Sequence, residues 1–122
     1  MRKVWVVDDD EEMAHAIGLM LKLLDCEVIL FPSARSAAQI LLTGRAPELL
    51  ILDINMPGVN GTEILAYLRR EPKLIPIPVF VVTSDDQPET RRKVMKLGAT
   101  AMIIKPATID VLENALKKAR IL

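Results

Sequence analysis

The sequence predicts an α/β protein with a doubly wound, five-stranded parallel sheet in a single domain, residues 1–122. Two observations predict this fold class. Short apolar runs alternate five times with segments of helical period, and no linker, repeat or low-complexity stretch interrupts the alternation. Strict alternation of strands and helices favours parallel strands that are covered by helices on both faces.

Five apolar runs are the expected strands, and they occupy residues 4–7, 27–31, 49–53, 78–83 and 101–105. The third run, LLILD, is continuously apolar before its acid, as expected of a strand that is buried on both faces. The proline-rich LIPIP that leads into the fourth run cannot continue a helix, so the fourth strand must begin after it.

The segments between the strands carry helix signals. The first has an apolar face at helical spacing, formed by Met13, Ile17, Met20, Leu21 and Leu24. The second helix is expected to start after Ser33 and to end at Gly44, the fourth to start at Pro88 and to end at Gly98, and the fifth to start after Thr108. The third is marked by its apolar residues Ile64, Leu65 and Leu68. Each strand is therefore followed by one helix.

The overall composition argues against several kinds of partner. Lys plus Arg and Asp plus Glu number 16 each, so the net charge is zero and favours neither nucleic-acid nor membrane binding. No apolar run reaches the roughly 18 residues of a membrane span. The lone Cys26 cannot form an internal disulfide, which favours a reducing compartment. We expect a cytoplasmic protein.

Like charge is nevertheless concentrated directly after the first strand, where VWVV runs into DDDEE. Two carboxylates about 4 Å apart repel by roughly 4 kcal/mol at an effective dielectric constant near 20. Asp10, Glu11 and Glu12 are expected to cap the first helix and to favour its dipole. Asp8 and Asp9 need another explanation.

Polar residues end four of the five expected strands, namely Asp8 and Asp9, Asp53, Thr83, and Lys105. If the strand order is 2-1-3-4-5, these tips lie side by side at the edge where α/β proteins bind ligands. Three acids and one lysine give −3 + 1 = −2, which one divalent cation would neutralise, and oxygen ligands suit Mg²⁺. A carboxylate in such a place can attack phosphorus, while an ammonium and a hydroxyl stabilise the phosphoryl oxygens.

Four motifs in this order, VVDDD, LDINMPGVNG, VVTS and IKPA, resemble the receiver domain of two-component response regulators over essentially the whole chain. Their spacing is also similar to that family: 53 − 9 = 44, 83 − 53 = 30 and 105 − 53 = 52. The resemblance implies a CheY-like, flavodoxin-like (βα)5 fold with strand order 2-1-3-4-5.

The resemblance further implies the role of each acidic residue. Asp53 would be phosphorylated by a histidine kinase. Asp9, Asp53 and the backbone carbonyl of Asn55 would bind Mg²⁺ directly, with Mn²⁺ as a substitute, while Asp8 would act through a metal-bound water. Gly58 and Gly61 would favour a turn with positive φ near the metal. The domain would not be an enzyme in the ordinary sense, because it catalyses only its own phosphorylation and slow self-dephosphorylation.

For the remaining positions, the resemblance implies that Lys105 pairs with Asp53 and then with the phosphoryl group, that Thr83 moves toward it, and that Lys105 precedes a cis proline. Asn55 and Asp85 would tune the attack of water on the phosphate. The fourth helix, fifth strand and fifth helix would form the output face, which would control an output domain or effector or form a homodimer.

Two residues depart from the family pattern. Met102 stands where an aromatic residue is usual, and Ala107 stands where phenylalanine is frequent. These departures argue against a strict coupling between the threonine and an aromatic side chain, and we expect the signal to pass instead through backbone shifts of residues 84–90 and the fourth helix.

Three other functions share parts of this pattern. A flavin-binding protein of the same fold would have to cradle phosphate in its first loop, which DDDEE would repel. A haloacid-dehalogenase phosphatase would need a threonine or similar residue where Glu12 stands. A receiver-like interaction module that is not phosphorylated is the remaining alternative.

Overall fold

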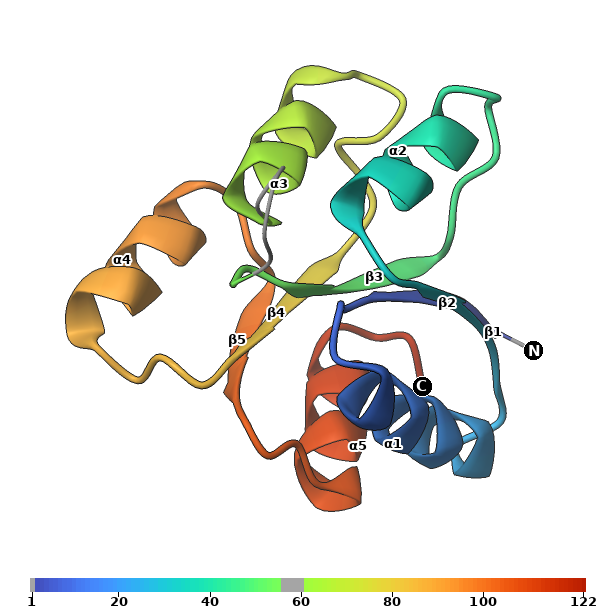
Figure 1. Cartoon of the computed structure of the whole chain (residues 1–122), viewed down its shortest axis with the longest axis vertical. Helices are drawn as coiled ribbons and strands as arrows, with labels where there is room; N and C mark the ends of the chain where they lie inside the picture. Colours follow the sequence, from blue (N-terminus) through green and yellow to red (C-terminus); the bar gives the residue numbers. More distant parts are fainter. Residues whose placement is uncertain (1, 56–60) are drawn as a thin grey trace.

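The computed structural model describes residues 2–55 and 61–122. Strands and helices alternate through the chain as predicted (Figure 1). The elements are β1 (Arg2–Val7), α1 (Glu11–Leu23), β2 (Cys26–Phe31), α2 (Ala34–Leu41), β3 (Leu49–Asp53), α3 (Gly61–Arg70), β4 (Val79–Thr83), α4 (Pro88–Lys96), β5 (Ala101–Ile104) and α5 (Ile109–Lys118). The bounds of the strands differ from the predicted ones by at most two residues.

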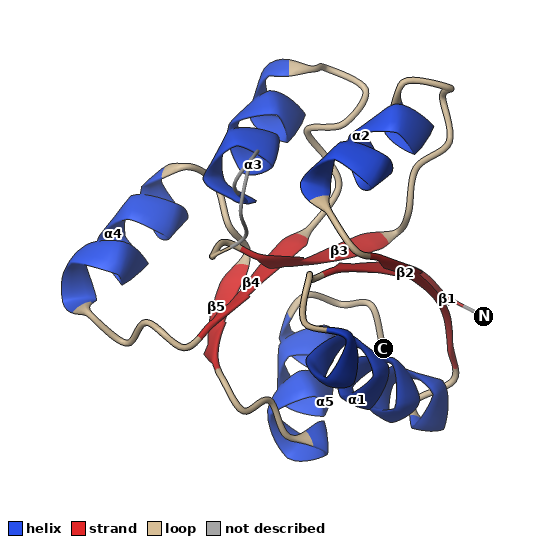
Figure 2. Ribbon diagram, viewed as in Figure 1, coloured by secondary structure: helices blue, strands red, loops and turns tan. Residues whose placement is uncertain are grey.

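The five strands form one parallel sheet in the order β2-β1-β3-β4-β5, which confirms the predicted topology. Helices α2, α3 and α4 cover one face of the sheet, and α1 and α5 cover the other (Figure 2). Every residue of β3 and β4 is buried, as expected for strands enclosed on both faces. Among the described helices, none has the length and apolar character needed to cross a bilayer.

Helix α1 packs against β2 through small residues that its predicted apolar face did not include. Ile17 and Leu21 are buried as expected, but the other buried residues of α1 are Ala14 and Gly18. A Cβ atom built on Gly18 would lie 3.4 Å from Cδ2 of Leu30. Small residues at the centre of the contact therefore let α1 approach β2, and the larger methionines flank it.

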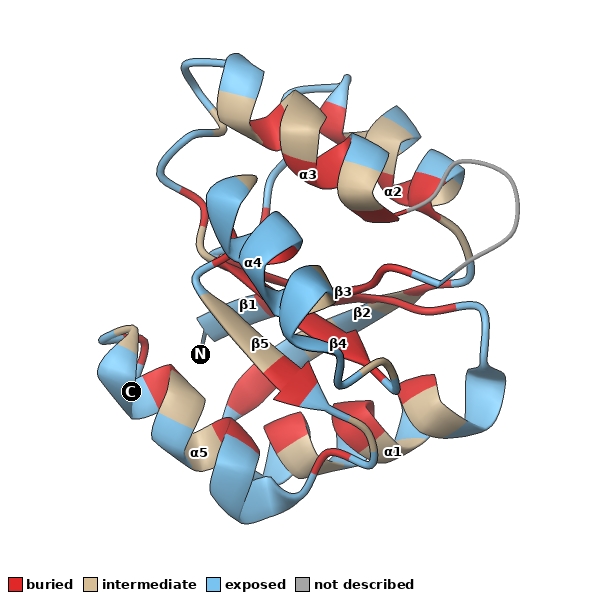
Figure 3. Ribbon diagram, turned by 90° about the vertical axis from the view of Figure 1, so that its left-hand side faces the viewer, coloured by how far each residue is buried: buried red, intermediate tan, exposed pale blue. Residues whose placement is uncertain are grey.

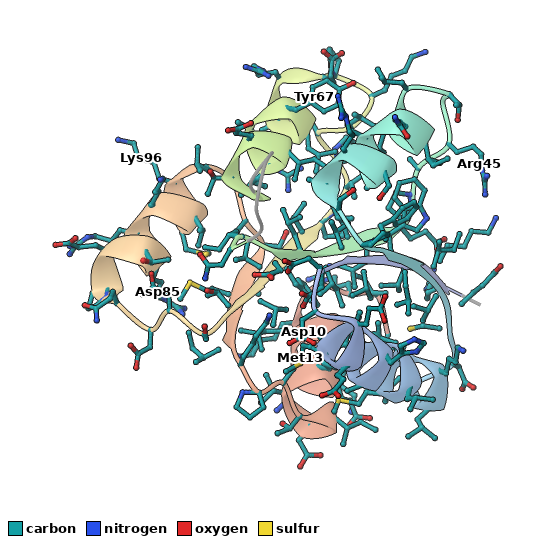
Figure 4. The ribbon with its side chains drawn as sticks, viewed as in Figure 1. Asp10, Met13, Arg45, Tyr67, Asp85 and Lys96 are labelled. Carbon is teal, nitrogen blue, oxygen red and sulfur yellow. The ribbon has the colours of Figure 1, made fainter. Side chains whose placement is uncertain are left out.

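The predicted positive φ at Gly61 is wrong: Gly61 begins α3 with an ordinary helical backbone, and its lack of a side chain is needed for close packing instead. The predicted helix signals are confirmed at several other termini. The side chains of Asp10, Ser33 and Thr108 each accept a hydrogen bond from the backbone N–H three residues later. Figure 4 shows Asp10 beside Met13 at the start of α1. Gly44 and Gly98 adopt φ angles of 93° and 106° after α2 and α4, which explains glycine at both places.

One arginine connects α3 with the chain that follows α4. The Nε atom of Arg69 donates to the carbonyl oxygen of Gly98 at 3.0 Å, and its Nη1 atom donates to that of Ile75 at 2.9 Å. Burial lowers the pKa of the Arg69 guanidinium below its ordinary value. The bond to Gly98 ties the chain after α4 to α3, and the bond to Ile75 holds the loop that follows α3.

Candidate functional site

The sheet brings the predicted acidic residues together at the carboxyl ends of β1 and β3. Asp8 and Asp53 are only 3% and 5% exposed, whereas Asp9 is exposed. One carboxylate oxygen of each of the three residues lies within 4.8 Å of the others. The backbone explains the arrangement, because β1 and β3 are hydrogen-bonded neighbours and both end at this edge.

Lys105 reaches this acidic cluster from the end of β5. Its Nζ atom lies 3.2 Å from Oδ2 of Asp8 and 3.5 Å from Oδ2 of Asp53. Its backbone N–H donates to the carbonyl oxygen of Thr83 at 2.8 Å, and its peptide bond to Pro106 is cis, as the resemblance implied. The pairing with Asp53 was predicted, but the closer contact with Asp8 was not.

The surroundings shift the pKa values of Asp8 and Lys105. Burial raises the pKa of Asp8, and the charge of Asp53 raises it further, against the opposing effects of the Asp10 N–H and Lys105. Burial alone would lower the pKa of Lys105, but Asp53 and Asp8 hold it above its ordinary value. At neutral pH the Lys105 ammonium therefore stays charged.

The cluster fits a cation, because one buried oxygen of Asp8 lacks a hydrogen bond. Oδ1 of Asp8 accepts from the backbone N–H of Asp10 at 2.9 Å. Oδ2 is buried and makes no hydrogen bond, although Lys105 lies nearby. The charge partner of that oxygen is the Lys105 ammonium, which Asp53 shares, and buried carboxylates cost free energy unless positive charge compensates them. Three acidic residues against one lysine leave room for a second cation of the kind that carboxylate oxygens prefer.

The end of β3 is held by its own loop. Oδ1 of Asp53 accepts from the backbone N–H of Asn55 at 3.0 Å. What the structure shows at Gly61 is a close approach, because an added Cβ would lie 2.5 Å from the backbone oxygen of Asp53. Gly58 lies outside the described residues. Asn55 is exposed, and the binding of metal by its carbonyl remains a prediction.

Thr83 is fully buried, with an exposed fraction of 0%, and its hydroxyl accepts two hydrogen bonds. The Nδ2 atom of Asn55 donates to Oγ1 of Thr83 at 3.0 Å, and the backbone N–H of Asp85 donates to the same atom at 3.1 Å. The side chain of Asn55 therefore connects the loop after β3 with the end of β4. The sequence pattern did not predict this contact.

The loop after β4 is fixed by Asp85, which lies beside α4 in Figure 4. Its Oδ2 atom accepts from the hydroxyl of Thr90 at 2.6 Å, and its Oδ1 atom accepts from the backbone N–H of Gln87 at 2.9 Å. These bonds lower the pKa of Asp85. Nothing predicted a role for Thr90, although an aspartate just before a helix that begins with Pro88 is a known turn signal.

Met102 lies in β5 at the floor of a groove between α4 and α5 with a volume of about 460 Å³. The side chain of Met102 is half-buried and packs against the core on the side of α2, α3 and α4. Ala107, the other departure from the family pattern, is buried on the side of α1 and α5. The two unusual residues therefore belong to opposite faces of the sheet.

Comparison with known proteins agrees with the fold. The family model described as "Response regulator receiver domain" matches residues 4–117. The two-component response regulator ORR8 of Oryza sativa is 31% identical over 106 residues, covering 87% of this chain and 88% of that protein. The phosphate regulon transcriptional regulatory protein PhoB of Rhizobium meliloti is 32% identical over 104 residues, covering 85% of this chain and 45% of that protein.

Solved structures give the same result. The chemotaxis protein CheY4 of Vibrio cholerae superposes with a TM-score of 0.87 at 25% sequence identity, covering 98% of each chain. The strand order, the acidic cluster at the carboxyl edge and the match over residues 4–117 lead to one assignment. The chain belongs to the family of response regulator receiver domains of two-component systems.

Proposed function

We propose that the domain is a phosphorylation-dependent switch in which Asp53 receives a phosphoryl group from a histidine kinase in the presence of Mg²⁺. The observation that carries this proposal is the surroundings of Asp53. Its buried carboxylate lies beside two further acids and 3.5 Å from the Lys105 ammonium. A carboxylate that is only structural would not need two more acids within 4.8 Å.

The metal would be held by Asp9, Asp53 and the backbone carbonyl of Asn55, while Asp8 would act mainly through a metal-bound water. Mg²⁺ is the best fit for a mostly oxygen site that keeps several waters, and Mn²⁺ would substitute for it. When bound, the ion neutralises negative charge on the phosphoryl oxygens. The buried Oδ2 of Asp8, which makes no hydrogen bond and shares its one ammonium with Asp53, supports a cation here.

In the proposed reaction a carboxylate oxygen of Asp53 attacks the phosphorus of a phosphohistidine. The new O–P bond forms as the N–P bond breaks, and the leaving imidazole nitrogen keeps the electron pair and takes a proton from water. Lys105 pairs with the transferred group, and the hydroxyl of Thr83 donates to one of its oxygens. Attack of water later removes the phosphate, so the domain acts on itself and not on other substrates.

A partner would recognise the phosphorylated state at the surface formed by α4, β5 and α5, where the groove beside Met102 lies. Phosphorylation replaces one negative charge by nearly two and adds strong acceptors, which can bias the position of a neighbouring element. We propose that this surface controls an output domain or an effector protein, or forms a homodimer. We place the domain in the cytoplasm and propose no direct contact with nucleic acid or membrane.

The phosphorylation site is tested with acetyl phosphate as the phosphodonor. We expect the purified chain to gain one phosphoryl group in the presence of Mg²⁺, as measured by intact-protein mass spectrometry. Asp53→Asn should abolish the label. Undiminished labelling of that variant would place the nucleophile elsewhere. The absence of labelling in the unmodified chain would favour the alternative, an interaction module that is not phosphorylated.

The metal assignment is tested with a pair of neighbouring acids. Asp9→Ala should weaken the binding of Mg²⁺ at least tenfold in a fluorescence or calorimetric titration, because it removes a direct ligand. Asp10→Ala is the matched control, since Asp10 already serves the first turn of α1. Equal losses in both variants would contradict the ligand assignment.

A further inference from the structure

We infer that the side chain of Asn55 is a positioning residue that turns the Thr83 hydroxyl into a hydrogen-bond donor toward the phosphoryl group. This inference rests on the proposed function and adds a role for Asn55 that is separate from its backbone carbonyl. It follows from the two bonds that reach Oγ1 of Thr83.

A hydroxyl group offers one proton and two lone pairs. In Thr83 both lone pairs are engaged, one by Nδ2 of Asn55 at 3.0 Å and one by the N–H of Asp85 at 3.1 Å. Within residues 2–55 and 61–122, no acceptor is hydrogen-bonded to the remaining proton. The hydroxyl can therefore form its third bond only as a donor, which is what a phosphoryl oxygen requires.

Asn55 is well placed to couple this hydroxyl to the phosphoacceptor. Its backbone N–H donates to Oδ1 of Asp53 at 3.0 Å while its side chain donates to Thr83. One residue thus holds both the carboxylate that would take the phosphoryl group and the hydroxyl that would bind it. Positioning of donors before the reaction lowers the cost of organising them in the transition state.

The second donor is fixed independently of Asn55. The N–H of Asp85 is held because the Asp85 carboxylate accepts from Gln87 and Thr90 at the start of α4. Loss of the Asn55 side chain would therefore free one lone pair of Thr83 and leave the other engaged. The hydroxyl could then rotate, and its proton would lose its fixed direction.

A double-mutant cycle tests the inference, with the initial rate of labelling by acetyl phosphate at saturating Mg²⁺ as the readout. Asn55→Leu removes the donor at nearly constant size and keeps the backbone carbonyl. We expect it to slow labelling about fivefold to tenfold, the effect of one neutral hydrogen bond worth roughly 1 kcal/mol. Its Mg²⁺ affinity should stay within about twofold, which separates a positioning role from a metal-binding one. Gln39→Leu, at an exposed amide on α2, is the matched control and should leave the rate unchanged.

The cycle is completed at Thr83. In a Thr83→Ala background, Asn55→Leu should cause no further slowing, because the hydroxyl that it positions is gone. In a Thr83→Ser background, which keeps a hydroxyl, the slowing should return. Equal slowing in the alanine background, or an effect confined to Mg²⁺ affinity, would overturn the inference while leaving phosphorylation of Asp53 in place. Absence of labelling in the unmodified chain would overturn the proposed function and the inference together.

Discussion

Helices α3 and α4 lie side by side on the same face of the sheet, yet they are attached to it differently (Figure 3). Helix α3 buries Ile64, Leu65 and Leu68, whereas the buried residue of α4 is Val94. Burial of one large apolar side chain contributes roughly 1.5–3 kcal/mol. Helix α3 is therefore part of the packed framework that carries the site, and α4 is held by much less apolar contact.

Polar contacts hold α4 where apolar ones are few. Asp85 accepts a hydrogen bond from Thr90 at its N-terminal end, and Arg69 donates to Gly98 at its C-terminal end. The N-terminal contact continues through the N–H of Asp85 to Thr83 in the site. Under the proposed function, a change of charge at the site would therefore shift α4 at smaller cost than α3, which is held by its apolar contacts.

The largest effect is expected from Leu65→Ala in α3. Leu65 is fully buried, and truncation of such a leucine costs about 2–5 kcal/mol through lost transfer free energy and the cavity left behind. Urea unfolding followed by circular dichroism would measure the loss. A loss below about 1 kcal/mol would show that α3 is no better packed than α4.

A smaller effect is expected from Val94→Ala in α4. The substitution removes the equivalent of about two buried methylene groups, so the expected loss in the free energy of unfolding is roughly 1.6 kcal/mol at about 0.8 kcal/mol for each group. Val94 is itself fully buried, so the comparison with Leu65 is between sites of equal burial. If this variant lost as much stability as Leu65→Ala in the same urea assay, the contrast between the two helices would be wrong.

The carboxylate of Asp8, buried at the end of β1, disfavours folding when it is ionised and no metal is bound. Because burial raises the pKa of Asp8 above its ordinary value of 3.8, the protonated form favours the folded state. In a chelator, the free energy of unfolding of the unmodified chain should therefore fall as the pH rises from about 4 through that raised pKa.

Asp8→Asn cannot ionise and keeps an oxygen that accepts from the Asp10 N–H. Its stability advantage over the unmodified chain should be absent below pH 3.8 and should appear as the pH rises to 7, a modest change of opposite sign to the two truncations. Denaturant unfolding in a chelator at several pH values measures it. A variant less stable at pH 7 would show that the ion pair with Lys105 outweighs burial.

The smallest effect is expected from Thr90→Val, which removes the hydroxyl that donates to Asp85 but keeps the β-branched shape. Backbone amides at the start of α4 should exchange with solvent several-fold faster, as measured by hydrogen–deuterium exchange, because the loop loses a local contact. Thr90→Ser is the control and should keep slow exchange. Faster exchange spread evenly over α3 and α4 would show that the contact supports the whole face instead of α4 alone.

The sequence was sufficient to predict the sheet and the convergence of Asp8, Asp53 and Lys105, because both follow from strand-length apolar runs and from the residues that end them. It could not predict the contacts of Asn55 with Thr83 or of Asp85 with Thr90. These bonds depend on side-chain directions in loops, which carry no periodic signal. The sequence also did not indicate that Ala14 and Gly18 form the centre of the contact between α1 and β2, because such small residues contribute little to a hydrophobic pattern.

The Arg69 bond to Gly98 has a mechanical consequence for α4. The buried Val94 and this bond both hold the C-terminal part of the helix, whereas Thr90 holds its N-terminal part through a single side-chain hydrogen bond, so α4 can tilt about its C-terminal end more easily than it can slide. The C-terminal end near Gly98 should act as the pivot, and the N-terminal end near Thr90 should travel furthest. A partner that reads this domain would then sense the angle of α4, with the largest displacement nearest the phosphoacceptor.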